Sequence, residues 1–302
     1  MGESLGYSYL RLGLLNSIIM AIELVISRTS NQLVLPKAYN LLGDLLWLTG
    51  ECHRAILCHE KTDDVIVNGQ NEQPKLRRLH YSSLLNRGLC YLSLWEIDKA
   101  HEFFLELNAL ATNGAFEKNI SYLEIYTFRA NFCLSLTYSL INDKKNTLLC
   151  INGTKIEKLE LIACGAWTRG YSMIFLAQAY KNINLIEQAN TKYQEALQFA
   201  KESAFPQVEA LALYGIGELE RIDCNYILAL SHIERSIIIL HKICAKPDLA
   251  EAYFQFGLTY QAMGEHDQTE TYKAKALDLF EEMKAPKQIE RVKQAFQQGA
   301  KQ

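Results

Sequence analysis

The sequence predicts an all-α solenoid of about seven helix-turn-helix repeats, closed by a C-terminal capping helix. Three observations lead to this fold class. A small residue recurs about every 40 residues, the few prolines fall at one place in that period, and apolar residues are spaced as in helices. Composition agrees, because 49% of the 302 residues are hydrophobic while only 16 are glycine and 5 are proline.

The recurring small residue opens a fixed frame. In "YFQFGLTYQAMGE" (253–265), a large residue follows Gly257 by three positions and a second glycine follows it by seven. The small residues that open the copies are Gly6, Gly43, Gly88, Ala177, Gly217 and Gly257, at intervals of 37, 45, 89, 40 and 40. Because the interval of 89 is about twice the others, we expect one degenerate copy inside it.

The prolines mark the start of each new helix pair. Proline fits the first turn of a helix and blocks a helix that runs into it from the preceding side. Each one lies 29 to 31 residues after a small residue of the frame. The five are Pro36, Pro74, Pro206, Pro247 and Pro286.

Between the prolines, apolar residues recur at steps of three and four, so each period is read as two helices. The predicted repeats are 1–35, 36–73, 74–117, 118–160, 161–204, 205–245 and 246–285, and the capping helix is 286–299. We expect them to form a single solenoid over residues 1–302. Repeat 118–160 is the degenerate one, because "NGT" at 152–154 interrupts what would otherwise be a full second helix.

This pattern resembles the tetratricopeptide repeat, whose signature runs W-x2-L-G-x2-Y, then A-x3-F, then A and P. "YFQFGLTY" (253–260) matches the first part, with Tyr253 in the Trp place and Phe256 in the Leu place, and "ANTKYQEA" (189–196) supplies the second part. The longer period is similar to that of bacterial transcription activators, signalling ATPases and peptide-sensing cytoplasmic regulators. The resemblance implies a right-handed solenoid.

The resemblance also implies that the first helix of each pair lines a concave face that binds an extended peptide. Amide side chains there would satisfy the peptide backbone, and aromatic and arginine side chains would anchor its side chains. For each residue, packing between helices is the alternative. The predicted peptide-binding residues are Trp47, Asn86, Trp167, Arg169, Tyr171, Gln178, Lys181, Tyr214, Glu218, Arg221, Phe254 and Gln261.

Two arginines in this set, Arg169 and Arg221, favour an acidic or C-terminal peptide, because guanidinium groups bind carboxylates in bidentate fashion. If the groove binds the peptide, Tyr214→Ala and Arg221→Ala are expected to weaken binding and to leave the melting curve almost unchanged.

We therefore expect a non-catalytic scaffold that binds a protein or peptide segment, as the sensor or interaction part of a larger regulator. The alternative is a peptide- or small-ligand-responsive regulator with phosphatase-like or transcription-control activity. Such an enzyme would need a polar catalytic group on a separate N-terminal helical bundle, and the sequence shows none. Because too few residues precede Gly6 for a full first helix, we expect the chain to be a piece of a longer protein.

Charge and hydropathy argue against nucleic-acid and membrane binding. The net charge is -3 and the pI is about 6.2, so the chain lacks the positive field of a nucleic-acid binder. The basic stretch "PKLRRLH" (74–80) is read as a solvated helix start. The apolar stretch 12–26 carries Asn16 and Glu23 and continues the repeat frame, so it is read as a packed second helix.

The cysteines and short motifs predict no cofactor, metal or catalytic residue. The eight cysteines have no paired spacing and are read as buried thiols in a reducing cytoplasm. In "CHRAILCH" (52–59), Cys52 and His59 share a helix face, but no C-x2-C pair completes a tetrahedral site. "GESLG" (2–6) matches G-x-S-x-G without the preceding strand that a nucleophile elbow needs.

The packing frame is tested by Ala189→Leu. If Ala189 lies at the contact between the two helices of a pair, the larger side chain overpacks that contact and should cost roughly 1–3 kcal/mol of unfolding free energy. Denaturant unfolding of both proteins measures the difference, and equal midpoints would show that the frame is misplaced.

Overall fold

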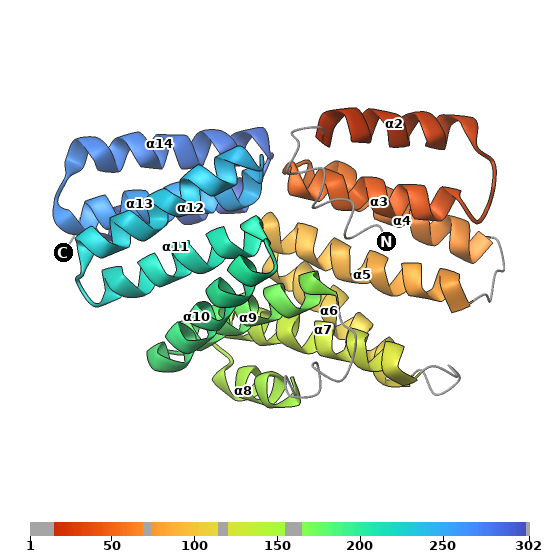
Figure 1. Ribbon diagram of the computed structural model, residues 1–302, viewed down its shortest axis with the longest axis horizontal. Helices are drawn as coiled ribbons and strands as arrows, with labels where there is room; N and C mark the ends of the chain where they lie inside the picture. The colour runs from red at the N-terminus through yellow and green to blue at the C-terminus, as the bar shows by residue number, and fades with distance from the viewer. Residues whose placement is uncertain (1–14, 69–73, 114–119, 155–164, 300–302) are drawn as a thin grey trace. The chain divides into compact units, whose positions relative to one another are not determined.

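The structure is a computed structural model that describes residues 15–68, 74–113, 120–154 and 165–299. Every regular element in these ranges is an α-helix, which confirms the predicted fold class (Figure 1). The chain divides into two compact units, Met1–Thr168 and Arg169–Gln302. The copy predicted around Gly6 and most of the loop at 68–75 lie outside the described residues.

Unit 1 is a succession of antiparallel helices, each packed on the next one in the sequence. Direct contacts also join α3 to α5 and α5 to α7. The helices are α2 (Leu15–Arg28), α3 (Leu35–Leu48), α4 (Cys52–Asn68), α5 (Pro74–Ser93), α6 (Ile97–Asn113), α7 (Ile120–Leu140) and α8 (Lys144–Gly153).

Unit 2 repeats this arrangement, and direct contacts join α11 to α13 and α13 to α15. Its helices are α9 (Ala166–Asn182, which begins just before the boundary), α10 (Ile186–Glu202), α11 (Pro206–Ile222), α12 (Tyr226–Lys242), α13 (Lys246–Met263), α14 (His266–Glu282) and α15 (Pro286–Gly299). We call α3, α5, α7, α9, α11 and α13 the first helices, and the helix that follows each of them the second helix of the pair. Within each unit, first helices of consecutive pairs therefore lie side by side.

The small residues of the frame lie where the two helices of a pair approach most closely. A Cβ on Gly88 of α5 would lie 2.3 Å from the Phe104 ring of α6, and one on Gly217 of α11 would lie 2.6 Å from Ile233 of α12. Such distances are well inside van der Waals contact, so only a small residue fits. The frame seen in the sequence is thus a packing device.

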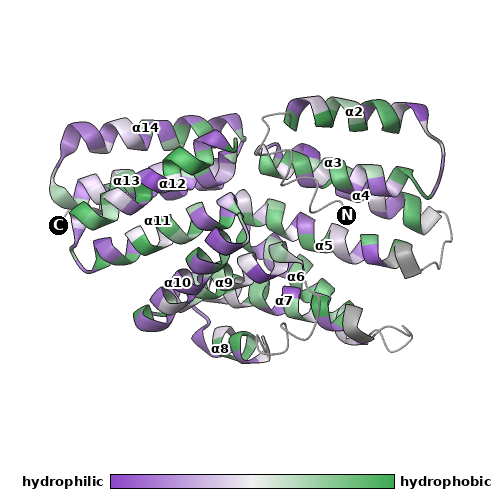
Figure 2. Cartoon of the chain, in the orientation of Figure 1, coloured by the Kyte–Doolittle hydropathy of each residue, from purple (hydrophilic) through white to green (hydrophobic). Residues whose placement is uncertain are grey.

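The second helices contribute the other half of this contact. Ala189 of α10 and Ala229 of α12 have no exposed surface, and Phe104 and Tyr193 are among the largest fully buried side chains. Hydrophobic and hydrophilic residues are mixed along each helix, as expected when one side faces the core and the other faces solvent (Figure 2).

The prolines stand at helix starts, as predicted. Pro36, Pro206 and Pro247 occupy the first or second helical position of α3, α11 and α13, and α5 and α15 begin at Pro74 and Pro286. Proline has no N–H to leave unsatisfied there, so it fits these positions without loss.

Unit 2 has a second period, of 20 residues, set by its turns. After each helix from α9 to α14 one residue takes a left-handed backbone conformation, and its neighbours close the turn by hydrogen bonds such as Asn225 N to Glu220 O (2.8 Å). These residues are Asn184, Ala204, Cys224, Cys244, Gly264 and Lys284, with φ between 50° and 79°. Equal helix and turn lengths explain the constant repeat of 40.

The second helix of the pair expected to be degenerate is short. Helix α8 has 10 residues and ends at Gly153, and Thr154 caps it through bonds to Cys150 O and Ile151 O. Asp143 caps its start by accepting a hydrogen bond from Asn146 N at 3.0 Å.

The apolar stretch at 12–26 is a packed helix over its described part. Leu15, Ile19 and Ile22 of α2 are buried, as the sequence predicts, while Met20 and Leu24 are exposed. None of the described helices combines the length and the apolar character needed to cross a membrane.

The left-handed turn at Ala204 gives a test with an internal control. A Cβ strains this conformation by about 1–2 kcal/mol, and the entropy that glycine adds to the unfolded chain offsets about half of the relief. Ala204→Gly should therefore raise the unfolding free energy by about 0.5–1 kcal/mol. Ala274→Gly, on the exposed side of α14, should lower it by a similar amount. Denaturant unfolding measures both, and equal signs would contradict the turn geometry.

Candidate functional site

The predicted peptide-binding residues all lie on first helices, but the structure places them in two groups of different burial. Trp167, Tyr171, Tyr214 and Phe254 are at most 8% exposed. Glu218 is also buried, at 5% exposure. Arg169 is exposed, and the remaining six residues are half-buried. They occur on α3 (Trp47), α5 (Asn86), α9 (Trp167, Arg169, Tyr171, Gln178, Lys181), α11 (Tyr214, Glu218, Arg221) and α13 (Phe254, Gln261).

After four of the small residues, the residue four positions later links one first helix to the next. Trp47 of α3 donates its Nε1–H to Ser93 Oγ of α5 at 2.9 Å. Gln261 of α13 donates from Nε2 to the carbonyl oxygen of Phe296 on α15 at 2.8 Å. Lys181 and Arg221 hold the same position in their repeats. We call these four residues the ladder donors.

Lys181 joins α9 to α11. Its Nζ lies 2.7 Å from Glu218 Oε2, and the two side chains are 20% and 7% exposed, so water screens the pair little. One turn away, Gln178 Nε2 donates to the Tyr214 hydroxyl at 3.2 Å. Burial raises the pKa of that hydroxyl well above its ordinary value, and nearby carboxylates add to the shift. Tyr214 is therefore neutral.

Arg221 joins α11 to α13. Its guanidinium donates to the Gln255 carbonyl oxygen at 3.0 Å and to Gln255 Oε1 at 2.8 Å. Burial lowers the pKa of Arg221, although Glu218 and Glu251 oppose that shift.

The next link, from α13 to α15, was missed by the sequence interpretation. Glu251 pairs with Arg291 of α15 and accepts a hydrogen bond from Gln255 Nε2 at 2.8 Å. Burial pushes the pKa of Glu251 upward, but Arg291 and Gln255 outweigh it, and the net pKa is lowered. Glu251 is thus an ionised, paired carboxylate.

A further link, between the starts of α11 and α13, was also missed by the sequence interpretation. Gln207 of α11 donates from Nε2 to Asp248 Oδ2 of α13 at 2.7 Å. Each of these residues directly follows a proline of the repeat frame. That shared position is a signal in the sequence that would have placed both on the first-helix surface.

The buried aromatic residues are core residues, which corrects one expectation. Trp167 packs 6.4 Å from the Phe132 ring, measured between centroids, and Phe254 packs 5.8 Å from Phe296. Tyr214 is 5% exposed, so Tyr214→Ala would remove core packing and lower stability by roughly 3–5 kcal/mol. The expectation that its melting curve stays unchanged is wrong.

Arg169 is set apart from the ladder. Its side chain is exposed, and the guanidinium lies 5.1 Å from the centre of the Phe199 ring on the second helix α10. The structure therefore brings Gln178, Lys181, Tyr214, Glu218 and Arg221 together, and it leaves Arg169 beside a second helix.

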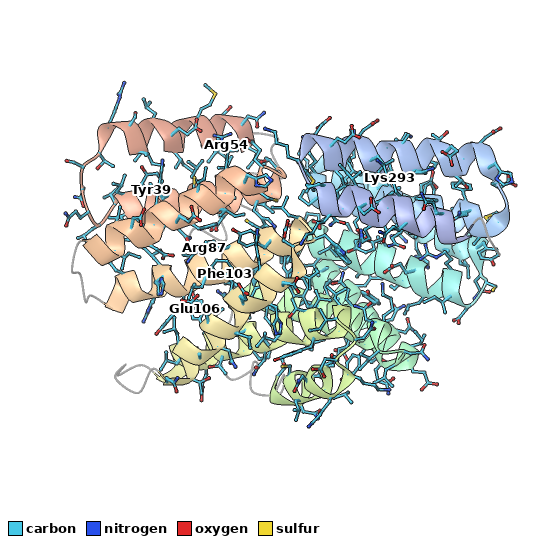
Figure 3. All side chains as sticks on the ribbon, turned by 180° about the vertical axis from the view of Figure 1, so that it is seen from behind. Tyr39, Arg54, Arg87, Phe103, Glu106 and Lys293 are labelled. Carbon is cyan, nitrogen blue, oxygen red and sulfur yellow. The ribbon has the colours of Figure 1, made fainter. Side chains whose placement is uncertain are left out.

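In unit 1, Asn86 of α5 donates from Nδ2 to Asp44 Oδ1 of α3 at 2.6 Å, so it too spans two first helices. A separate cluster centres on Asp63, which accepts from Ser83 Oγ (2.9 Å) and Arg87 Nη2 (2.6 Å). Arg87 also lies over the Phe103 ring at 4.6 Å (Figure 3). The Asp63 cluster ties α4 to α5.

The stretch that raised the question of a metal site is part of the core. Cys52 and His59 have no exposed surface, and burial lowers the pKa of His59 to about 3. In the part of the chain that the structure describes, no three His, Cys, Asp or Glu side chains are grouped to hold a metal ion.

Comparison with known proteins agrees with this geometry. Residues 208–282 match the family model described as Tetratricopeptide repeat. A crystal structure of a Rap protein complexed with Competence and Sporulation Factor superposes with a TM-score of 0.60 at 14% identity, covering 96% of this chain and 79% of that one. Residues 208–282 are therefore similar to the tetratricopeptide repeat, and the chain shares its fold with this Rap protein.

Two other solved structures share the fold of this chain. Aspartyl phosphate phosphatase F from Bacillus subtilis has a TM-score of 0.51 at 18% identity, covering 99% of this chain and 82% of that one. BtubC (BKLC) from P. vanneervenii has a TM-score of 0.50 at 16% identity, covering 77% and 92%. A sequence search of curated proteins found no match.

The strength of the ladder is measured by a double-mutant cycle on Lys181→Met and Glu218→Gln. Because this pair is shielded from water, we expect a coupling energy of about 1–2 kcal/mol. The exposed pair Lys192–Glu195 within α10 is the control, and its coupling should be about 0.2–0.5 kcal/mol. Equal coupling in the two cycles, measured by denaturant unfolding, would show that the ladder does not stabilise the stack.

Proposed function

We propose that this chain is a non-catalytic scaffold that binds a protein or peptide segment along its first helices. One observation carries the proposal. In unit 2 the first helices α9, α11 and α13 lie side by side, and each presents a half-buried amide or charged group at the same position of the repeat, namely Lys181, Arg221 and Gln261. An extended peptide passing over several helices would meet such a group in every repeat.

The internal hydrogen bonds of these groups are compatible with ligand binding. An amide such as Gln178 has two N–H donors and a carbonyl acceptor, and the bond to Tyr214 uses one donor. Exchanging one hydrogen-bond partner for another changes the free energy little, since a typical bond contributes only about 0.5–1.5 kcal/mol net. A peptide backbone therefore has accessible donors and acceptors to use.

The fold comparison supports a binding role. A Rap protein of the same fold has been crystallised in complex with Competence and Sporulation Factor. We infer a protein or peptide partner, inside the cell, for this chain as well. The alternative is a peptide- or small-ligand-responsive regulator with phosphatase-like or transcription-control activity. We assign no chemical step to any described residue, so the scaffold is the function that we propose.

Peptide display against the full chain tests the proposal. Among selected peptides, Arg221→Ala should weaken binding about five-fold or more, since truncating an arginine in an interface typically costs at least about 1 kcal/mol. The matched control is Arg235→Ala on the exposed side of the second helix α12, which should leave the dissociation constant unchanged.

Because Arg221 also links α11 to α13, its variant is first checked by thermal melting, and binding is measured well below the melting temperature. Loss of binding in the Arg235 variant with normal binding in the Arg221 variant would place the site on the second helices and overturn the proposal.

A further inference from the structure

In unit 2, the cationic side chains that link one first helix to the next already have partners. Lys181 pairs with Glu218, Arg291 pairs with Glu251, and Arg221 donates to Gln255. A ligand carboxylate would have to displace one of these partners. The network is therefore poorly suited to the acidic peptide that the sequence favoured.

A hydrogen-bond acceptor, in contrast, is available at Gln207 of α11. Gln207 is 3% exposed, and its Oε1 is buried without a hydrogen-bond partner among the described residues. Its Nε2 donates to Asp248 Oδ2. Since Oε1 and Nε2 belong to one amide group, the unsatisfied oxygen lies beside the same carboxylate. A buried acceptor without a donor is unfavourable, because it has lost its hydrogen bonds to water.

Asp248 is half-buried, and among the described residues it has one side-chain hydrogen-bond partner, Gln207, and no ion pair. Burial raises its pKa to about 6, the Gln207 hydrogen bond lowers it, and the negative charge of Glu251 raises it again. At neutral pH the carboxyl is ionised. A half-buried carboxylate without a counter-charge is stabilised when a cation binds beside it.

The groups around Asp248 do not supply that cation. From α11 it faces Gln207 and the neutral Tyr214, whose pKa Asp248 itself raises. On its own helix, Lys246 pairs with Glu282 of α14, and Glu251 pairs with Arg291 of α15.

We propose that Asp248 and Gln207 form a subsite for a cationic donor group, the guanidinium or ammonium of an arginine or lysine side chain in the bound segment. The inference rests on the proposed scaffold function and specifies the chemistry of its ligand. Asp248 accepts the charge, and Gln207 Oε1 accepts a second N–H. Guanidinium fits best, because its planar N–H groups bind two acceptors side by side.

The test uses two short probes that differ in charge alone, acetyl-Gly-Arg-Gly-amide and the same peptide with neutral citrulline in place of arginine. Binding to the full chain is followed by ligand-observed NMR titration at pH 7.5. We expect the arginine probe to bind at least ten-fold more tightly than the citrulline probe. Asp248→Asn should remove this preference, and Glu270→Gln, at an exposed carboxylate of α14 in the same unit, should keep it.

The pH dependence provides a second readout. Protonation of Asp248 competes with the cation, so the dissociation constant of the arginine probe should rise about ten-fold between pH 7.5 and pH 5, given a pKa of about 6. In Asp248→Asn this rise should disappear. The arginine side chain keeps its charge over the whole range.

Stability separates lost binding from lost folding. Because Asp248→Asn removes an unpaired charge, its melting temperature at pH 7.5 should equal or exceed that of the unmodified chain. Equal binding of the two probes, or an arginine preference that survives in the Asp248 variant, overturns the subsite. Display peptides that still depend on Arg221 would then show that the scaffold function stands without it.

Discussion

The close contact between the two helices of each pair is the constraint on which the rest of the structure depends. At Gly88 and Gly217 a single Cβ would collide with a buried side chain of the partner helix. This contact fixes how far apart the helices lie and which side of each faces the core. With that side fixed, the residue four positions later points toward the next first helix, as Lys181 and Arg221 do.

The ladder that results has two roles that compete. Polar bonds between first helices hold consecutive pairs together, and the same groups are the ones that a bound segment would meet. Where the internal bonds are complete, as at the Lys181–Glu218 pair, the surface is stable and has little left to offer a ligand. Where they are incomplete, at Gln207 and Asp248, the folded chain is less stable, and an amide oxygen and a carboxylate can still accept hydrogen bonds from a ligand.

Features set by short-range chemistry were predictable from the sequence. Proline at the start of α11 and the end of α8 at Gly153 follow from local backbone preferences, and the helix class follows from apolar spacing. The ladder partners were not predictable, because Lys181 and Glu218 are 37 residues apart and their contact depends on the offset between repeats. The burial of Tyr214 was missed because helical periodicity alone does not say whether an aromatic residue at the edge of the stripe turns inward.

The central claim is that ligands bind across the first helices. Hydrogen–deuterium exchange of the full chain, with and without a peptide selected by display, tests it most directly. The account predicts slower exchange on binding in α11 and α13, the helices that carry Arg221 and Asp248, with little change in α12. Protection concentrated in α10, α12 and α14, with α11 and α13 unchanged, would contradict it.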